Sequence, residues 1–121
     1  MQPRFASVDE RRLFQRFIAR FPAKFKDSRS DFGEEVVLRD ASAQGARLST
    51  TETLFLDDHV IVEVELPDGK PSLVLRGRVV WKHSLNEKNW DVGMQFPEPQ
   101  LTRLSRLFEV THPSPHDLPA N

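Results

Sequence analysis

The sequence predicts a mainly β protein: a single six-stranded antiparallel β-barrel with one C-terminal α-helix. Apolar and polar residues alternate over several short segments, which is the period of strands that have one solvated face. The apolar period changes from two to three or four only near the C-terminus, as in a helix with one apolar stripe. A chain of 121 residues with 38% apolar content is large enough for one core and too small for two.

Six segments are predicted as strands, at residues 20–26, 34–40, 45–50, 60–66, 73–82 and 90–96. Turn-forming Gly, Asn, Asp and Pro residues separate them, as in "PDGK" and "SLNEKN". So many short strands would leave exposed edges, and we therefore expect the sheet to close into a barrel. Trp81 and Trp90 are expected to fill this barrel or its mouth, with stacking on a nucleotide as the alternative.

The C-terminal part combines a predicted helix with a polar tail. Leu101, Leu104, Leu107 and Phe108 repeat at helical spacing after two prolines, so this helix is expected to pack on the barrel. Residues 111–121 are proline-rich with little to bury, and are expected to be a disordered tail. The expected organisation is a flexible N-terminal arm at 1–19, a barrel with its helix at 20–110, and the tail.

Composition and charge limit the classes of function. There is no cysteine, which excludes disulfides and thiolate chemistry and favours a reducing compartment, so we expect a cytoplasmic protein. No stretch approaches the roughly 20 apolar residues of a membrane span, and no membrane insertion is expected. Residues 1–26 carry a net charge of +5 and the remainder −6, which suggests a local anion site rather than a nucleic-acid-binding face.

The N-terminal arm contains a pair of arginines at regular spacing. "RLFQR" (12–16) places Arg12 and Arg16 four residues apart, which brings side chains together on one helix face or one side of a short turn. Two like charges held in this way repel each other, and the pair would suit a site that binds an anion. A solvated basic face is the simpler interpretation, and Arg16 with Arg20 repeats the spacing.

A second motif lies between two predicted strands. In "DASAQG" (40–45), Asp40 and Ser42 are two residues apart and Gly45 ends the segment. The two side chains can share one turn, while Gly45 permits close approach of another backbone or a positive φ. An Asx turn that joins the strands is the simpler interpretation of this segment alone.

Together the two motifs resemble those of the PilZ domain, a bacterial family of cyclic di-GMP receptors. That family carries Arg-x-x-x-Arg on an N-terminal arm and Asp/Asn-x-Ser-x-x-Gly about 20 to 30 residues later, the order found here. "LRGRVVWKH" (75–83) and "WDVGMQF" (90–96) are similar to the family's late strands. The resemblance covers most of residues 10–110 and implies a PilZ-like barrel that binds cyclic di-GMP.

The family pattern also favours one of the two arginine pairs. Arg12 and Arg16 fit better than Arg16 and Arg20, because Arg11 completes the double arginine frequent in the family. Arg20 already belongs to the strand alternation and is expected to face solvent. Arg11 would reach a second stacked ligand molecule, with a solvated side chain as the alternative.

The resemblance implies a role for each motif residue. Arg12 and Arg16 would bind phosphate and the edge or face of a guanine, for which guanidinium groups are well suited. Asp40 would accept hydrogen bonds from the guanine N1–H and N2–H₂ edge. Ser42 would hydrogen-bond nearby, and Gly45 would leave room for the base.

Little in the sequence favours an enzyme, a cofactor or a metal. There is no Gly-rich phosphate loop, nucleophile elbow or zinc-protease helix. "LDDHV" (56–60) places two carboxylates and a histidine in a row, but consecutive residues do not easily converge on one ion. We expect binding without turnover, no metal and no cofactor.

The leading prediction is a cyclic di-GMP receptor whose arm becomes ordered on binding and signals to an unidentified partner protein. One alternative is a PilZ-like adaptor that does not bind nucleotide; the intact motifs argue against it. The other is a small β-barrel that binds single-stranded nucleic acid. That function would need aromatic and basic residues across a whole sheet face, and the acidic body disfavours it.

Overall fold

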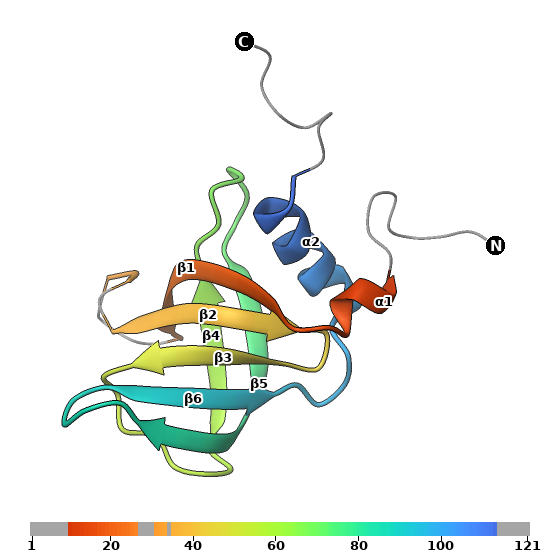
Figure 1. Cartoon of the computed structure of the whole chain (residues 1–121). Coiled ribbons are helices and arrows are strands. Elements are labelled where there is room, and N and C mark those ends of the chain that lie inside the picture. Colours follow the sequence, from red (N-terminus) through yellow and green to blue (C-terminus); the bar gives the residue numbers. More distant parts are fainter. Residues whose placement is uncertain (1–9, 27–30, 34, 114–121) are drawn as a thin grey trace.

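The computed structural model describes residues 10–26, 31–33 and 35–113, which form six strands and two helices (Figure 1). In chain order the elements are α1 (Glu10–Leu13), β1 (Phe17–Phe25), β2 (Val36–Ser42), β3 (Gly45–Thr50), β4 (His59–Val64), β5 (Leu73–Ser84), β6 (Trp90–Gln95) and α2 (Leu101–Thr111). The predicted mainly β class, the six strands and the C-terminal helix are confirmed.

The strands form one antiparallel sheet in the order β1-β2-β3-β6-β5-β4. β1 also pairs with β4, through Ala23, Lys24 and Phe25, so the sheet closes on itself as a barrel. The outer strands β1 and β4 therefore satisfy each other's backbone groups and leave no long open edge for another chain to pair with.

The core lies inside the sheet and is built from alternate residues of the strands. Leu38, Leu48, Val62, Leu75 and Val92 come from five different strands, and each is at most 1% exposed. Burial of each such side chain contributes about 1.5–3 kcal/mol, which is the main stabilisation available to a chain without disulfides. The predicted outward position of Arg20 is confirmed, since this residue of β1 is exposed.

Both helices lie beside the barrel and pack on each other (Figure 1). α2 packs against β1 and β5, with Leu104 and Leu107 fully buried, as its apolar stripe predicted. Phe108 of α2 meets Phe17 of β1 edge to face, with ring centroids 5.1 Å apart. Among the described residues, neither helix is long and apolar enough to cross a membrane.

An ion pair fastens α2 to the loop between β4 and β5. Arg106 donates from Nε to Asp68 Oδ2 at 2.8 Å, and from Nη2 to Asp68 Oδ1 at 3.0 Å and to the Pro71 carbonyl at 2.7 Å. The hydrogen bonds from Arg106 lower the pKa of Asp68 from 3.8 to about 2, despite partial burial of the carboxylate. We refer to Asp68, Pro71 and Arg106 as the Asp68 clasp.

The strand pairing is interrupted by three β-bulges, in β1, β2 and β5, and those in β2 and β5 determine which side chains of the site face outward. In β2, Leu38 pairs with Leu48 and Asp40 with Arg47, so one extra residue is inserted opposite β3. In β5, the pairing with β6 likewise shifts between Val79 and Trp81. An extra residue reverses the inward and outward alternation of everything that follows it.

The bulge in β5 makes the expected position of Trp81 wrong. Val79 is fully buried, and straight alternation would place Trp81 inside as well. The extra residue instead turns Trp81 outward, where it is 41% exposed and covers Gly93 of β6. Trp90 is half-buried and packs against the core.

The element boundaries differ from the predicted organisation at both ends. β1 begins at Phe17, inside the segment 1–19 assigned to the arm, and α1 also lies in that segment. α2 continues to Thr111, the first residue of the predicted tail. Residues 1–9 of the arm and 114–121 of the tail lie outside the described residues.

Candidate functional site

The bulge in β2 positions the second sequence motif on the outer face of the sheet. Leu38 and Ala41 are both fully buried, although they lie three positions apart and would face opposite sides of a regular strand, because the bulge lies between them. Asp40 and Ser42, on either side of Ala41, therefore point away from the core. Their backbone partners across the pair of strands are Arg47 and Gly45.

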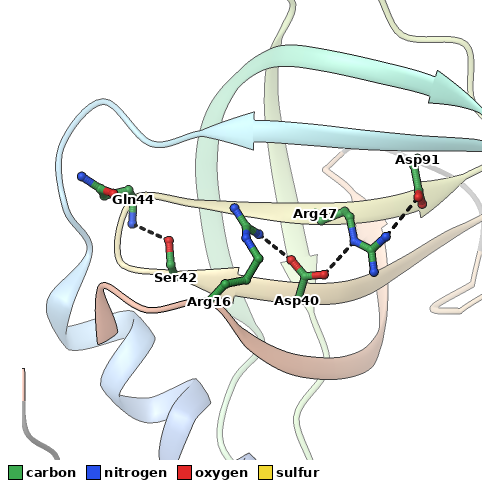
Figure 2. Close-up of polar contacts among 6 residues, drawn as sticks. All are labelled: Arg16, Asp40, Ser42, Gln44, Arg47 and Asp91. Carbon is green, nitrogen blue, oxygen red and sulfur yellow. Dashed lines mark hydrogen bonds and ion pairs between the residues drawn. The ribbon is translucent and has the colours of Figure 1, made fainter. Parts of the chain in front are cut away.

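Asp40 lies at the centre of a row of charged groups that we call the Asp40 cluster: Arg16, Asp40, Arg47 and Asp91 (Figure 2). Arg16 Nη1 forms an ion pair with Asp40 Oδ1. Arg47 donates from Nε to Asp40 Oδ2 at 2.7 Å and from Nη1 to Asp91 Oδ2 at 3.1 Å. The cluster alternates in sign, so each charge has an opposite neighbour.

The two arginines that share Asp40 are held very differently. The pKa of Arg47 is raised above its ordinary value, mainly by the hydrogen bond to Asp40 and further by the charge of Asp91, against the opposing effect of burial. Its side chain is 35% exposed, whereas that of Arg16 is 53% exposed. Arg47 is thus a fixed cation within the sheet, and Arg16 is a more accessible one at its edge.

The segment that carries Arg16 is anchored next to the second motif. Leu13 at the end of α1 is fully buried, and its carbonyl accepts a hydrogen bond from the backbone N–H of Ala43, in the β2–β3 turn. The chain then passes from α1 into β1, and this path brings Arg16 over Asp40. The contact joins two motifs that are 24 residues apart in sequence.

Arg12 and Arg16 do not share one helix face, because α1 ends at Leu13. Arg12 is exposed on α1 and is not among the residues that line the hollow described below. Arg11 is exposed on the same helix. Of the predicted site residues, Arg16, Ser42 and Gly45 line the hollow and Asp40 contacts Arg16 beside it, whereas Arg11 and Arg12 do not line it.

The turn between β2 and β3 is shorter than predicted, and Asp40 takes no part in it. Ser42 pairs with Gly45, which leaves Ala43 and Gln44 as the two turn residues. Ser42 Oγ accepts a hydrogen bond from the Gln44 backbone N–H at 3.2 Å. The Asx-turn interpretation is wrong for Asp40, which belongs to the strand and to the Asp40 cluster.

Gly45 is required by close backbone packing. A Cβ at this position would overlap the carbonyl oxygen of Met94 on β6, a backbone atom that cannot move aside easily. Its φ is not positive, so of the two explanations for this glycine the close approach is confirmed and the positive φ is wrong.

A hollow of about 240 Å³ opens beside these residues. Its lining includes Arg16, Ser42, Gly45, Trp81 and Gln95. A larger hollow of about 480 Å³ lies across Gln95 and contains none of the predicted site residues. We take the smaller hollow as the candidate site, because residues of both sequence motifs, Arg16, Ser42 and Gly45, line it.

Sequence inspection missed two residues of this region, Arg47 and Asp91, and gave Trp81 a stacking role only as the alternative. Arg47 follows Gly45 by two residues, so strand alternation places it on the outer face beside Asp40, and that signal could have been used. Asp91 lies 44 residues from Arg47 and meets it only through the pairing of β3 with β6. Trp81 was assigned to the wrong face because the bulge in β5 has no clear mark in the sequence.

The segment considered for a metal has an ordinary structural role. Asp57 pairs with Arg78 at 2.6 Å, and Asp58 accepts from the backbone N–H of Phe55 at 2.9 Å, which shapes the turn before β4. Within the described residues, no group of three or more His, Cys, Asp or Glu side chains is arranged to hold a metal ion.

Comparison with known families agrees with this geometry. The family model described as the PilZ domain matches residues 10–110, which is most of the chain. The chain therefore belongs to the PilZ domain family, which is known as a family of cyclic di-GMP-binding modules. No curated protein sequence matches the chain.

Proposed function

We propose that this protein is a cytoplasmic cyclic di-GMP receptor that binds the dinucleotide at the hollow beside the Asp40 cluster. The observation that carries the proposal is that Arg16, Ser42 and Gly45 line that hollow, while Asp40 forms an ion pair with Arg16 directly beside it. These four residues come from the two motifs that the family resemblance singled out. Membership of the PilZ family supports the same ligand.

The ligand requires both charges that the site contains. Cyclic di-GMP carries two phosphates, which suit a guanidinium, and two guanines, whose N1–H and N2–H₂ groups suit a carboxylate. Arg16 would turn from Asp40 to a phosphate or a guanine, and Asp40 Oδ1 would then accept from the base. Each charge-assisted hydrogen bond from these groups would contribute about 1.5–3 kcal/mol toward the ~8 kcal/mol of micromolar binding, and stacking and further contacts from the arm would offset the ordering costs.

Trp81 and the glycines beside it would define the shape of the site. Trp81 presents an exposed indole face at the rim, which can stack on a purine. Gly93 lets the indole lie against β6, because a Cβ there would overlap the ring. Ser42 would hydrogen-bond the ligand, and Gly45, which has no side chain, would leave room for the base.

The arm would complete the site over the remainder of the ligand. At about 240 Å³ the hollow is smaller than the roughly 300–1,000 Å³ of most ligand pockets, so part of a dinucleotide would project beyond it. Arg12 and Arg11, on the exposed side of α1, would then close on the projecting part, with Arg11 able to reach a second ligand molecule. The reordered arm would present a changed surface to a downstream protein.

Titration calorimetry with cyclic di-GMP tests the proposal most directly. Heat is expected from cyclic di-GMP and not from cyclic di-AMP or GTP, and Arg16→Ala should weaken binding by about a hundredfold. Arg20→Ala is the matched control, since Arg20 is exposed on β1 at the same four-residue spacing. Absence of heat with the wild-type protein would instead favour an adaptor that does not bind nucleotide.

A further inference from the structure

We propose that Arg47, held in turn by Asp91, is the positioning residue that keeps Asp40 aimed at the guanine after Arg16 has turned to the ligand. The proposal rests on the proposed cyclic di-GMP function and assigns a role to two residues outside both sequence motifs. It makes Arg47 a determinant of guanine recognition even though Arg47 does not line the hollow.

The two oxygens of Asp40 are divided between two arginines. Oδ1 pairs with Arg16, and Oδ2 accepts from Arg47 Nε at 2.7 Å. A ligand that attracts Arg16 would therefore free one oxygen and leave the other bound. The carboxylate would keep its orientation because one of its two hydrogen-bonding partners stays in place.

Arg47 is fixed at its other end as well. Its Nη1 donates to Asp91 Oδ2 at 3.1 Å, and Asp91 Oδ1 accepts from Ser49 Oγ at 3.1 Å. The backbone reinforces this arrangement, since Asp40 pairs with Arg47 and Ser49 pairs with Asp91 across adjacent strands. The contacts run from Ser49 on β3 to Asp91 on β6, back to Arg47 on β3, and from there to Asp40 on β2. They therefore connect three strands of one sheet.

Arg16 is held by fewer contacts than Arg47 within the part of the chain that the structure describes. It follows α1 and precedes β1, its side chain is 53% exposed, and Asp40 is the partner it contacts. Turning it toward a phosphate replaces one ion pair with another and needs no change in the sheet. Turning Arg47 would break two ion pairs at once. The ligand should therefore recruit Arg16 and leave Arg47 with Asp40.

The chemistry requires arginine at this position. Arg47 uses two nitrogens of one planar group, Nε toward Asp40 and Nη1 toward Asp91. A lysine has one terminal nitrogen and cannot hold both carboxylates at this separation. Without Arg47, Asp40 could rotate to follow Arg16, and the resulting internal pair would compete with the ligand.

The test compares cyclic di-GMP with the cyclic dinucleotide in which hypoxanthine replaces guanine, a ligand that lacks only the N2 amino groups. Calorimetry on the full chain would use the wild type, Arg47→Ala, Arg47→Lys and Asp91→Asn. Arg47→Ala should bind cyclic di-GMP about tenfold more weakly and lose most of the preference for it over the hypoxanthine ligand. Arg47→Lys should recover part of the affinity, and Asp91→Asn should have a smaller effect.

Two controls separate positioning from general destabilisation. Arg106→Ala removes the arginine of the Asp68 clasp, and should lower the melting temperature while leaving affinity and preference unchanged. Asp91→Asn combined with Arg47→Ala should bind like Arg47→Ala alone, since Asp91 acts through Arg47. If Arg47→Ala does not fold, Arg47→Lys and Asp91→Asn still carry the test.

The outcomes distinguish the positioning role of Arg47 from the proposed cyclic di-GMP binding on which it rests. No binding of cyclic di-GMP by the wild type would overturn the proposed function and, with it, the role of Arg47. Wild-type binding that Arg47→Ala leaves unchanged would overturn the role of Arg47 alone. An equal loss of affinity for both ligands would also overturn it, because misplacement of Asp40 must affect the guanine amino group most.

Discussion

The Asp40 cluster and the Asp68 clasp are both built from arginine and aspartate, but the two groups serve different roles. In the clasp, Arg106 contacts both oxygens of Asp68, which also accepts from the backbone N–H of Lys70, and both side chains are about four-fifths buried. In the cluster, Asp40 is shared by two arginines, and one of them is more than half exposed beside a hollow. In the clasp, Arg106 and Asp68 pair with each other, whereas in the cluster Arg16 is exposed and can exchange Asp40 for a ligand.

This difference shows how one type of ion pair can serve stability or binding. A closed, partly buried pair loses its energy when either partner is removed, and the structure gains nothing by opening it. A pair with an exposed partner contributes little to folding, since solvent screens it. The exposed partner is for the same reason available to an incoming anion.

The largest expected contrast comes from the same substitution in both places. Asp40→Ala should weaken cyclic di-GMP binding by about ten- to a hundredfold, and it should also lower the melting temperature, because it removes a buried carboxylate that pairs with Arg47. Asp68→Ala should leave binding unchanged and lower the melting temperature by about 4–8 °C, for a loss of about 1–2 kcal/mol. Calorimetry and thermal denaturation of the two variants measure both effects. Equal behaviour of the two variants would remove the distinction between the clusters.

Salt should produce a smaller contrast. Binding that depends on Arg16 and a phosphate should weaken roughly fivefold when sodium chloride is raised from about 50 to about 500 mM, because exposed charges are screened. The difference in melting temperature between wild type and Asp68→Ala should stay nearly constant, since the clasp is partly buried. Titrations and melting curves at both salt concentrations check this. A dissociation constant that is independent of salt would argue against phosphate pairing.

Acidification should weaken the Asp68 clasp, and the resulting change in melting temperature is the smallest of the expected effects. The pKa of Asp68 is about 2 in the folded protein, below the ordinary 3.8, chiefly because of the hydrogen bonds from Arg106. On acidification the unfolded chain therefore takes up this proton first, and the stabilisation is lost as pH falls from about 4 to about 2. The gap in melting temperature between wild type and Asp68→Ala should narrow across this window and stay constant above it. A gap that persists at pH 2 would contradict the assignment.

Much of the fold followed from local patterns. The alternation in residues 60–66 and the stripe through Leu104 and Leu107 each correspond to one element, because a strand or helix repeats its own period regardless of its neighbours. Arg16, Asp40, Ser42 and Gly45 were found through their motifs, and Asp40 does contact Arg16 beside the hollow that the others line. The pairing of Arg12 with Arg16 on one helix face was wrong, because α1 ends between them.

What local patterns could not supply were the bulges in β2 and β5 and the contacts that depend on them. The extra residues in β2 and β5 turn Asp40 and Trp81 outward, and each bulge is defined by the partner strand rather than by its own sequence. Arg47 and Asp91 meet only once β3 and β6 are paired. Periodicity along the chain was therefore enough to assign the strands and the helix, and the two motifs were enough to indicate the family. The register between strands, set by packing of the whole barrel, determined which charges face one another and which of them remains free to move.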